Sequence, residues 1–497
     1  MSDVNIQYDG FKAIINGVKT PPSIYWEVKE EQKEALNSLI RNKTLPLTYP
    51  DNSFNSGLLM YRKVGNGSYE VLSGLLPTLS KQYRFEVVVN KVNTPLPSVK
   101  PFLKSLRDYQ EESVNKILKN KRGVISIATG GGKTRIISEL INQYKNEGLN
   151  IVVLVPTINL LSQMVNDINE YNNISLDIGK IGGGKVKLNK EITVAIPNTL
   201  YSRKDNEDIQ SFLNNIDILL VDEVHVMMSP TCCFIYSCVP NVKVKVGFSA
   251  TPQFNLLTEG MFGPILHEES PEELIKNNVI ECPEVIFHKV KPKYLTGNIS
   301  SWVLNRNIVD RIGKFSPSKY AKLTNELIIK HKSRNELIVS LVEKALEENR
   351  GPAIIVVSKV DSEVNHPDYL LPLLKERLGL DVPVIKGSNK SSKDLIQALK
   401  EGELKVAIAG PKILQFGANI PILNCVVLAG AGKDDKILIQ QIGRVLRSHE
   451  SKMNNKPLII SFMDTQFPFT NQAKSRWDTC VEVYGEENVT LVGDNDE

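Results

Sequence analysis

The feature that most constrains this chain is the glycine-rich run from Ala128 to Thr134, which reads Ala-Thr-Gly-Gly-Gly-Lys-Thr. A short apolar run at 124–128 precedes it, and apolar residues at helical spacing follow it. Glycines let backbone N–H groups wrap around phosphate oxygens, and the start of the following helix adds positive potential. The order of strand, loop and helix therefore predicts a phosphate-binding loop in an α/β domain.

Two side chains of this loop carry the expected chemistry. Lys133 is expected to contact the β- and γ-phosphates of ATP, and the Thr134 hydroxyl to bind Mg²⁺. The general phosphate-loop pattern has glycine where Ile127 stands, so this loop is a variant of that pattern. The other candidate cofactor-binding residues of the loop are Thr129, Gly130, Gly131 and Gly132. The loop alone predicts nucleotide binding and nothing more.

A pair of acids, Asp222 and Glu223, follows the apolar run at 218–221. Burying two carboxylates costs free energy unless a cation or a reaction uses them. Asp222 is expected to hold Mg²⁺, and Glu223 to orient or deprotonate an attacking water. By itself the pair would also fit an exposed turn. Its position about ninety residues after the phosphate loop favours the catalytic interpretation.

A third group of candidate catalytic residues lies far along the chain, at Gln440, Arg444 and Arg447. The two arginines are three residues apart, so on a helix they share a face. A planar guanidinium matches phosphate oxygens in a bidentate manner. In isolation the pair would fit a solvated basic face. Because it lies about three hundred residues after Lys133, it is expected to act as an arginine finger from a second domain.

The chain divides into blocks that predict its domains. Residues 1–97 indicate a small α+β unit, and prolines between 93 and 101 favour an extended linker. Residues 102–283 and 335–497 each alternate short apolar runs with helical stretches, which is typical of a parallel sheet with crossover helices. Residues 284–334 are expected to bridge them. The expected strands are 4–15, 57–63, 69–72, 85–89, 124–128, 151–156, 192–196, 218–221, 245–249, 353–357, 382–385, 406–409, 426–428 and 458–462, and residues 27–40 are an expected helix.

Composition sets weaker limits. The formal net charge of the 497 residues is only +4, which permits a nucleic-acid partner without requiring one. The six cysteines lack zinc spacing, and we expect them to be reduced. Neither a signal peptide nor an apolar run of about 18 residues is visible, so no membrane partner is expected. A cytoplasmic location is expected, in the host cell if a phage encodes the chain.

In this order, the three groups of residues resemble superfamily 2 helicases over about 102–448. The resemblance implies two tandem RecA-like parallel-sheet domains that share one ATP site, preceded by a small α+β domain. Residues 106–110 resemble the adenine-recognition segment. The resemblance implies that Gln110 reads the base and that Arg107 is a further cofactor-binding candidate. Residues 415–421 resemble motif V, which supplies the candidates Gly417 and Asn419. Many members have aspartate where Asn419 stands, and asparagine keeps hydrogen-bonding capacity.

Within the superfamily, the chain resembles phage branch-migration helicases of the UvsW kind. The matching runs are 181–185, 260–263 and 426–430. The resemblance places nucleic-acid backbone contacts at Pro156, Thr157, Gly183, Thr199, Ser358 and Gly387. Backbone contacts carry no sequence information, so we expect DNA to be recognised by its structure.

The resulting expectation is a monomeric, ATP- and Mg²⁺-dependent DNA helicase or translocase that acts on forks and Holliday junctions, in the 3′ to 5′ direction. The N-terminal block is expected to bind DNA. An RNA helicase and the motor subunit of a restriction-type nuclease remain alternatives. A nuclease would need a metal-binding acid cluster, and Pro367-Asp368 lacks a following partner at persuasive spacing. An ATP-gated clamp would need a broken catalytic acid, and Glu223 is present.

Overall fold

The computed structural model describes residues 5–8, 12–16, 25–27, 39–40, 42, 45, 47, 57–66, 68–83, 98–173, 175–188, 190–250, 255–290, 317–360, 362–386, 390–411, 420–430, 442–443, 456–466 and 469–493. The chain forms two compact units. The first comprises residues 1–128 with 132–270, and the second comprises 129–131 with 271–497.

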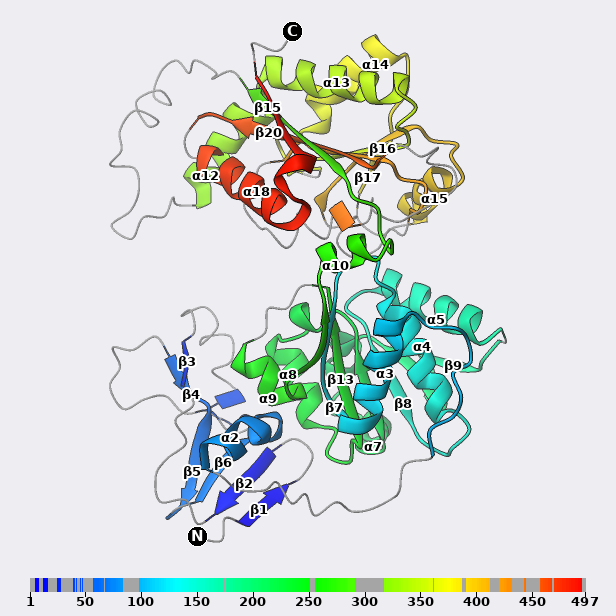
Figure 1. Ribbon diagram of the computed structural model, residues 1–497, viewed down its shortest axis with the longest axis vertical. Coiled ribbons are helices and arrows are strands. Elements are labelled where there is room, and N and C mark those ends of the chain that lie inside the picture. Colours follow the sequence, from blue (N-terminus) through cyan, green and yellow to red (C-terminus); the bar gives the residue numbers. More distant parts are fainter. Residues whose placement is uncertain are drawn as a thin grey trace. The chain divides into compact units, whose positions relative to one another are not determined.

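The N-terminal block of the first unit is a small α+β structure (Figure 1). Its elements are β1 (Asn5–Tyr8), β2 (Lys12–Asn16), β3 (Tyr25–Glu27), β4 (Gly57–Leu59), β5 (Tyr61–Gly65), β6 (Ser68–Leu72), η1 (Ser73–Leu75) and α2 (Leu76–Tyr83). Four strands pair antiparallel in the order β1-β2-β6-β5. The strand-like run expected at 4–15, which carries a turn signal at Gly10, contains the two paired strands β1 and β2. The expected strand at 85–89 and most of the expected helix at 27–40 lie outside the described residues.

The larger part of the first unit is a sheet in the order β10-β9-β11-β8-β12-β13-β7-β14, parallel except for β10. Its strands are β7 (Arg122–Ile127), β8 (Ile151–Leu154), β9 (Ile178–Gly182), β10 (Lys185–Val186), β11 (Ile192–Ala195), β12 (Ile218–Val221), β13 (Val244–Ser249) and β14 (Ile265–Glu269). The five strands expected here are confirmed to within two residues at each end. Every residue of β8, β11, β12 and β13 is buried, because helices cover both faces of the sheet (Figure 1).

The helices of this part connect successive strands. They are α3 (Asp108–Asn120), α4 (Lys133–Tyr144), α5 (Ile158–Asn172), α6 (Pro197–Tyr201), α7 (Glu207–Asn214), η2 (Val224–Val226), α8 (Pro230–Ser237) and α9 (Leu256–Phe262). The linker ahead of α3 is fastened to α4: the Lys100 backbone N–H donates to Gln143 Oε1 at 2.8 Å, and the Leu103 N–H donates to Glu139 Oε2 at 3.2 Å. The end of the linker therefore has a fixed path along α4.

The N-terminal block packs directly against α9. A methyl group built on Gly74 would lie 2.1 Å from the Glu259 carbonyl oxygen, and one on Gly260 would lie 2.6 Å from Leu72 Cδ1. One hydrophobic cluster joins the block to the larger sheet, including Leu72 and Phe262. The run 260–263 therefore has a structural role as the surface on which the block is seated.

Replacing Gly74 by alanine is expected to destabilise the first unit by about 3 kcal/mol. The added methyl group would meet three backbone atoms of residues 259–263 at 2.1 to 2.7 Å, and backbone cannot move aside as a side chain can. Thermal unfolding would measure the effect. Gly65→Ala is the matched control, because its methyl group would meet only Ser68, at 3.5 Å. Equal melting temperatures for the two variants would contradict the tight seating.

The second unit contains a sheet in the order β17-β18-β16-β19-β20-β15-β21, with all of its pairs parallel. Its strands are β15 (Glu284–Val290), β16 (Ala353–Val356), β17 (Val384–Ile385), β18 (Val406–Ala409), β19 (Cys425–Leu428), β20 (Leu458–Asp464) and β21 (Val489–Val492). Its helices are α10 (Pro271–Lys276), α12 (Pro317–Thr324), the π-helix η4 (Asn325–Ile329), α13 (Lys332–Glu347), α14 (Pro367–Leu378), α15 (Lys390–Lys400), α18 (Phe469–Tyr484) and η6 (Glu486–Asn488).

The five strands expected in this unit are confirmed, but the sheet is larger than expected. β15 comes from the start of the segment expected to bridge the two domains, and it pairs with both β20 and β21. Its alternating burial pattern has charged residues at Glu284 and Lys289, which hid the strand from an apolar-run criterion. Residues 284–290 are thus part of the second sheet.

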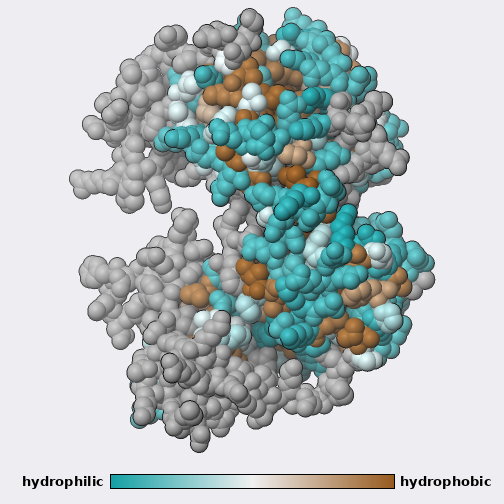
Figure 2. Space-filling model, in the orientation of Figure 1, coloured by the Kyte–Doolittle hydropathy of each residue, from teal (hydrophilic) through white to brown (hydrophobic). Residues whose placement is uncertain are grey.

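The helices in the described part of the chain are all too short or too polar to cross a lipid bilayer. Figure 2 shows hydrophilic residues over much of the described surface on the face drawn, with hydrophobic residues in separate patches.

Candidate ATP and nucleic-acid site

The candidate ATP residues of the first unit gather at one edge of its sheet. The phosphate loop, of which residues 132–134 belong to this unit, follows β7. The acid pair follows β12, and Ser249 ends β13, which lies between those two strands. All three strands are parallel, so their carboxyl ends meet at the same edge. Functional loops of open parallel sheets lie at this edge. The topology thus brings together residues that are more than a hundred positions apart.

The phosphate loop has the backbone that only glycine adopts readily. Gly130 and Gly132 have φ of +91° and +82°. Lys133 begins α4, and its ammonium donates to the Ile127 carbonyl oxygen at 2.9 Å. The lysine is therefore held at the mouth of the loop, with backbone N–H groups at the start of α4 beside it.

The side chain of Gln110, the predicted adenine reader, packs against this loop. The Gln110 side chain is fully buried, and its Oε1 accepts a hydrogen bond from the Arg107 backbone N–H at 3.1 Å. A methyl group on Gly132 would lie 2.5 Å from Gln110 Nε2, so the amide packs directly against the loop. Arg107 sits at the N-cap of α3. In this arrangement Gln110 fixes the loop as well as the first turn of α3.

The acid pair combines a buried aspartate with a glutamate that has a strained backbone. Asp222 is 7 % exposed, and its Oδ1 accepts from the Glu223 backbone N–H at 3.0 Å. Glu223 has a left-handed backbone with φ of +50°, which is costly for a residue with a side chain. Its Oε2 is buried and has no hydrogen-bond partner among the described residues. Strain and an unsatisfied carboxylate oxygen are typical of a catalytic position.

His225 connects the acid pair to the end of β13. Its Nδ1 lies 3.0 Å from Ser249 Oγ and 3.5 Å from Glu223 Oε2. Ser249 is the last residue of β13. A single imidazole therefore links the candidate base to the end of β13. Neither His225 nor Ser249 was among the predicted site residues.

The residues at this edge fit a Mg²⁺-bound triphosphate. Asp222 and Thr134 offer the oxygen ligands that Mg²⁺ prefers, and Lys133 offers a cation for phosphate. The second residue of α4, Thr134, also lines a hollow between α4 and α5 with Lys104 and Tyr171. The Glu223 carboxylate, whose Oε2 is buried without a hydrogen-bond partner among the described residues, is suited to accept a proton from water.

The predicted nucleic-acid residues of the first unit occupy the other half of the same edge. Pro156 and Thr157 follow β8, Thr199 follows β11, and Gly183 follows β9. These three strands are neighbours in the order β9-β11-β8, and β8 pairs with β12 on its other side. The edge therefore has an ATP half and a half that carries the nucleic-acid candidates.

Gly183 forms an exposed hairpin tip. β9 and β10 pair from Gly182 to Lys185, which leaves Gly183 and Gly184 as the two-residue turn. Both have positive φ, of +58° and +81°, as this type of hairpin requires. The glycines therefore present bare backbone at the edge.

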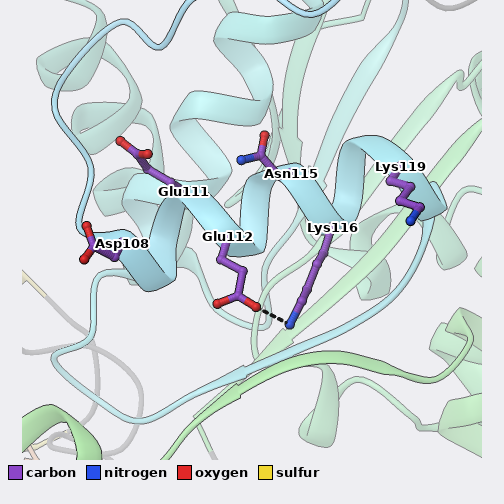
Figure 3. Close-up of a pocket in the computed structure, with 6 residues that line it drawn as sticks. All are labelled: Asp108, Glu111, Glu112, Asn115, Lys116 and Lys119. Atoms are coloured by element: carbon purple, nitrogen blue, oxygen red, sulfur yellow. Dashed lines mark ion pairs between the residues drawn. The ribbon is translucent and has the colours of Figure 1, made fainter.

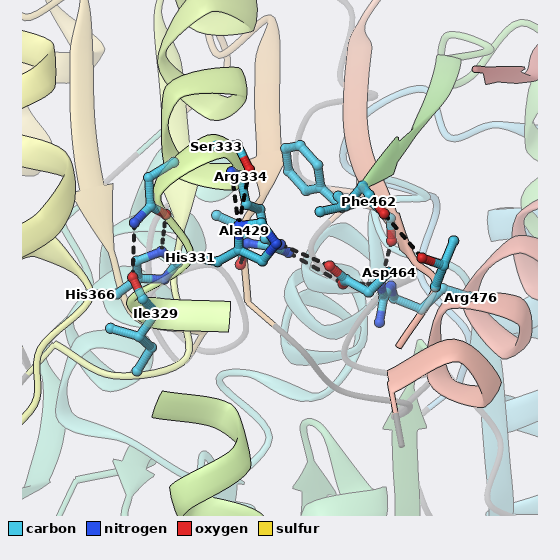
Figure 4. Close-up of polar contacts among 12 residues, drawn as sticks. Ile329, His331, Ser333, Arg334, His366, Ala429, Phe462, Asp464 and Arg476 are labelled. Carbon is cyan, nitrogen blue, oxygen red and sulfur yellow. Dashed lines mark hydrogen bonds and ion pairs between the residues drawn. The ribbon is translucent and has the colours of Figure 1, made fainter. Parts of the chain in front are cut away.

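Six predicted site residues lie outside the described residues: Gly387, Gly417, Asn419, Gln440, Arg444 and Arg447. Ser358, the remaining candidate of the second unit, is half-buried directly after β16. Sequence reasoning missed a buried group close to it, built from Arg334, His366 and Asp464 (Figure 4). A single arginine in an amphipathic helix gives no signal of burial, so only the fold could reveal this group.

A shallow hollow along α3 is a surface feature without catalytic chemistry (Figure 3). Its lining residues lie along one helix face, with acids toward the start of α3 and lysines toward its end, an arrangement that complements the helix dipole. Glu112 and Lys116 form an ion pair at 2.7 Å, and this lysine lowers the pKa of the Glu112 carboxyl. Such a pair stabilises an exposed helix.

Comparisons with known proteins match the two α/β parts separately. A family described as the res subunit of type III restriction enzymes matches residues 103–254, and the helicase conserved C-terminal domain matches residues 333–449. The first match contains the phosphate loop and the acid pair, and the second contains both predicted arginines. The chain belongs to helicase superfamily 2. It is an ATP-driven helicase by family.

Two relatives illustrate this membership. The DNA 3′-5′ translocase XPB2 of Sulfurisphaera tokodaii is 26 % identical over 399 residues, which cover 74 % of this chain and 84 % of the relative. The ATP-dependent DNA helicase uvsW of Enterobacteria phage T4 is 24 % identical over 359 residues, covering 69 % of this chain and 66 % of the relative. The expected resemblance to UvsW is thus confirmed.

Among solved structures, S. cerevisiae Dbp5 bound to RNA and ADP BeF3 matches with a TM-score of 0.57 at 18 % identity. The match covers 79 % of this chain and 91 % of Dbp5. At this identity the likeness concerns the fold alone. It confirms the expected pair of RecA-like parallel-sheet domains.

Proposed function

We propose that this superfamily 2 helicase is a 3′ to 5′ DNA translocase that acts on branched DNA such as forks and Holliday junctions. The observation that supports the proposal is that the candidate ATP residues and the candidate nucleic-acid residues of the first unit follow neighbouring parallel strands at one edge of the sheet. The names of the two relatives, a DNA 3′-5′ translocase and a phage DNA helicase, support DNA and this direction.

In the proposed reaction, Lys133 binds the β- and γ-phosphates, while Thr134 and Asp222 hold Mg²⁺. The metal supplies charge neutralisation of the phosphates. Glu223 orients water and accepts its proton, because its Oε2 is buried without a hydrogen-bond partner among the described residues. Arg444 and Arg447 stabilise the charge that develops on the γ-phosphate.

Further proposed roles follow from the resemblance. Arg107 and Gln110 lie at the adenine side of the site, Gly417 and Asn419 contact ribose or DNA, and Gln440 belongs with the two arginines. Through these residues the site would recognise the adenine and ribose of the nucleotide as well as its phosphates.

The proposed nucleic-acid contacts are phosphate contacts without base reading. Pro156, Thr157, Gly183 and Thr199 would meet the DNA backbone from the first unit, and Ser358 and Gly387 from the second. Contacts from backbone N–H and hydroxyl groups carry no sequence information, so DNA structure decides where the motor acts. Such binding weakens as salt rises.

The N-terminal block is proposed to select branched DNA. It shares a hydrophobic cluster with the first sheet, so it would hold bound DNA at a fixed place relative to the ATP half of the edge. Deleting residues 1–97 would expose that cluster, so a loss of DNA binding could not be distinguished from a loss of folding stability. Charge changes on exposed residues of the block, such as Lys63→Glu, test the role more cleanly.

ATP hydrolysis measured with single-stranded, forked and four-way DNA and with matched RNA tests the proposed substrate. DNA is expected to raise kcat above that with RNA, and branched DNA to reach half-maximal rate at the lowest concentration. Equal or greater stimulation by RNA would favour the RNA helicase alternative.

The restriction-enzyme name of the first family match favours one further candidate, a nuclease motor. Among the described residues no group of three or more His, Cys, Asp or Glu side chains could hold a metal ion. Incubating the chain with DNA, ATP and Mg²⁺ and looking for cleavage products decides between the two functions.

A further inference from the structure

Two adjacent residues near the start of α13 are fastened to different loops of the second sheet. Arg334 is fully buried and Asn335 is 2 % exposed. Their side chains reach the carboxyl edge of the sheet, where the loops after β16 and β19 begin. A buried polar pair at this place calls for an explanation, because replacing buried ions with apolar residues often stabilises a protein.

Arg334 ties together the ends of two neighbouring strands (Figure 4). Its Nη1 donates to the Ala429 carbonyl oxygen at 2.8 Å, directly after β19. Its Nε and Nη2 donate to the two carboxylate oxygens of Asp464, at 2.9 and 3.4 Å, at the end of β20. The guanidinium lies over the Phe462 ring, 4.6 Å from its centroid. Every part of the guanidinium therefore has a partner that fixes it.

Asn335 fastens the loop that follows β16. Its Oδ1 lies 3.0 Å from His366 Nε2, and its Nδ2 donates to the Ile329 carbonyl oxygen at 2.8 Å. His366 in turn donates its backbone N–H to the Lys359 carbonyl oxygen at 3.2 Å, next to Ser358. Burial, with the charge of Arg334, lowers the pKa of His366 to about 3. The ring is therefore neutral near pH 7, and its Nε2–H donates to Asn335.

The two fastened loops touch each other. The Gly430 N–H donates to the Val356 carbonyl oxygen at 2.9 Å. A methyl group built on Gly430 would lie 3.0 Å from both the backbone nitrogen and the Oγ of Ser358. Ser358 is the proposed nucleic-acid contact, and Gly430 leads along the chain toward Arg444. Movement of one loop must therefore disturb the other.

We propose that Arg334 and Asn335 are positioning residues that make ATP turnover respond to nucleic-acid binding at the Ser358 loop, because they hold that loop and the end of β19 at Ala429 and Gly430 to one helix. They hold both loops to one rigid helix, so that a contact made by the first is transmitted to the second. This inference rests on the proposed function of these loops. It concerns residues that contact neither ATP nor nucleic acid.

The test compares Arg334→Lys and Asn335→Ala with the control Arg350→Lys. Lysine keeps a positive charge facing Asp464. Its single ammonium lacks the planar set of donors with which the arginine bonds Asp464 and the Ala429 carbonyl oxygen at the same time. Arg350 pairs with Glu284 at the opposite, amino edge of the same sheet, so its replacement perturbs an ion pair away from both loops. ATPase is measured with and without forked DNA, and the KM for ATP is measured alongside.

Arg334→Lys and Asn335→Ala are each expected to lower the ratio of DNA-stimulated to DNA-independent kcat about tenfold, a size typical of coupling between sites. The KM for ATP and the DNA-independent kcat should stay within about twofold, which a general loss of structure would not allow. The Arg350→Lys ratio should match the wild type. Unchanged ratios in both test variants would overturn the inference.

Gly430→Ala provides a second variant that removes no buried charge. Its methyl group would push against Ser358, so the same ratio is expected to fall even if the Arg334 variant folds poorly. A normal ratio in Gly430→Ala would contradict the coupling. A wild-type chain whose ATPase is insensitive to every DNA would instead contradict the proposed function, and the inference with it.

Discussion

Glu223→Gln is expected to lower kcat for ATP hydrolysis by about a hundred- to ten-thousandfold while ATP still binds. The amide keeps the shape of the side chain but cannot accept a proton from water. In the folded chain Glu223 Oε2 has no hydrogen-bond partner among the described residues and lies 3.5 Å from His225 Nδ1, so the amide would disturb little besides this one contact. Steady-state ATPase and equilibrium binding of a fluorescent ATP analogue measure the two effects.

Glu207→Gln is the matched control, because Glu207 is an exposed acid in the first turn of α7. It should leave both measurements unchanged. If Glu223→Gln retained more than about a tenth of the wild-type kcat, another group would have to serve as the base.

Lys133→Ala is expected to reduce ATP hydrolysis by at least about a hundredfold and to weaken ATP binding, because a cation aimed at the β- and γ-phosphates is lost. The variant should still bind DNA, since the proposed DNA contacts lie on the other half of the edge. Removal of the ammonium also frees the Ile127 carbonyl oxygen, so the melting temperature is compared at the same time.

Lys119→Ala, at the exposed end of α3, serves as the control for loss of one positive charge. Its ATPase and DNA affinity should match the wild type. Near-normal turnover by Lys133→Ala would refute the assignment of the loop, whereas lost DNA binding would place the lysine outside the ATP half.

Much of the fold was predictable because buried parallel strands are short apolar runs. β12 and β18 have the bounds that their sequences predict, since Ile218–Val221 and Val406–Ala409 are apolar throughout and end at polar or glycine-containing segments. β15 was missed because it alternates buried and partly exposed residues, with Glu284 and Lys289 among them. Pairing with β20 and β21, and not composition, makes it a strand.

The candidate site was predictable where chemistry requires one residue type at a fixed spacing. Gly130, Gly132 and Lys133 stand out because bare backbone and a cation are needed beside phosphate. The burial of Arg334, its pairing with Asp464 and the seating of Gly74 depend on contacts between segments far apart in the chain. No local pattern encodes such contacts.

The central claim is that ATP turnover at this edge drives movement on branched DNA. The most direct measurement is strand displacement from a forked duplex, with ATP, with a non-hydrolysable ATP analogue, and with Lys133→Ala in place of the wild type. The account predicts displacement by the wild-type chain with ATP and none in the other two cases. Displacement without hydrolysis, or none by an ATPase-active wild-type chain on any fork or four-way junction, would contradict it.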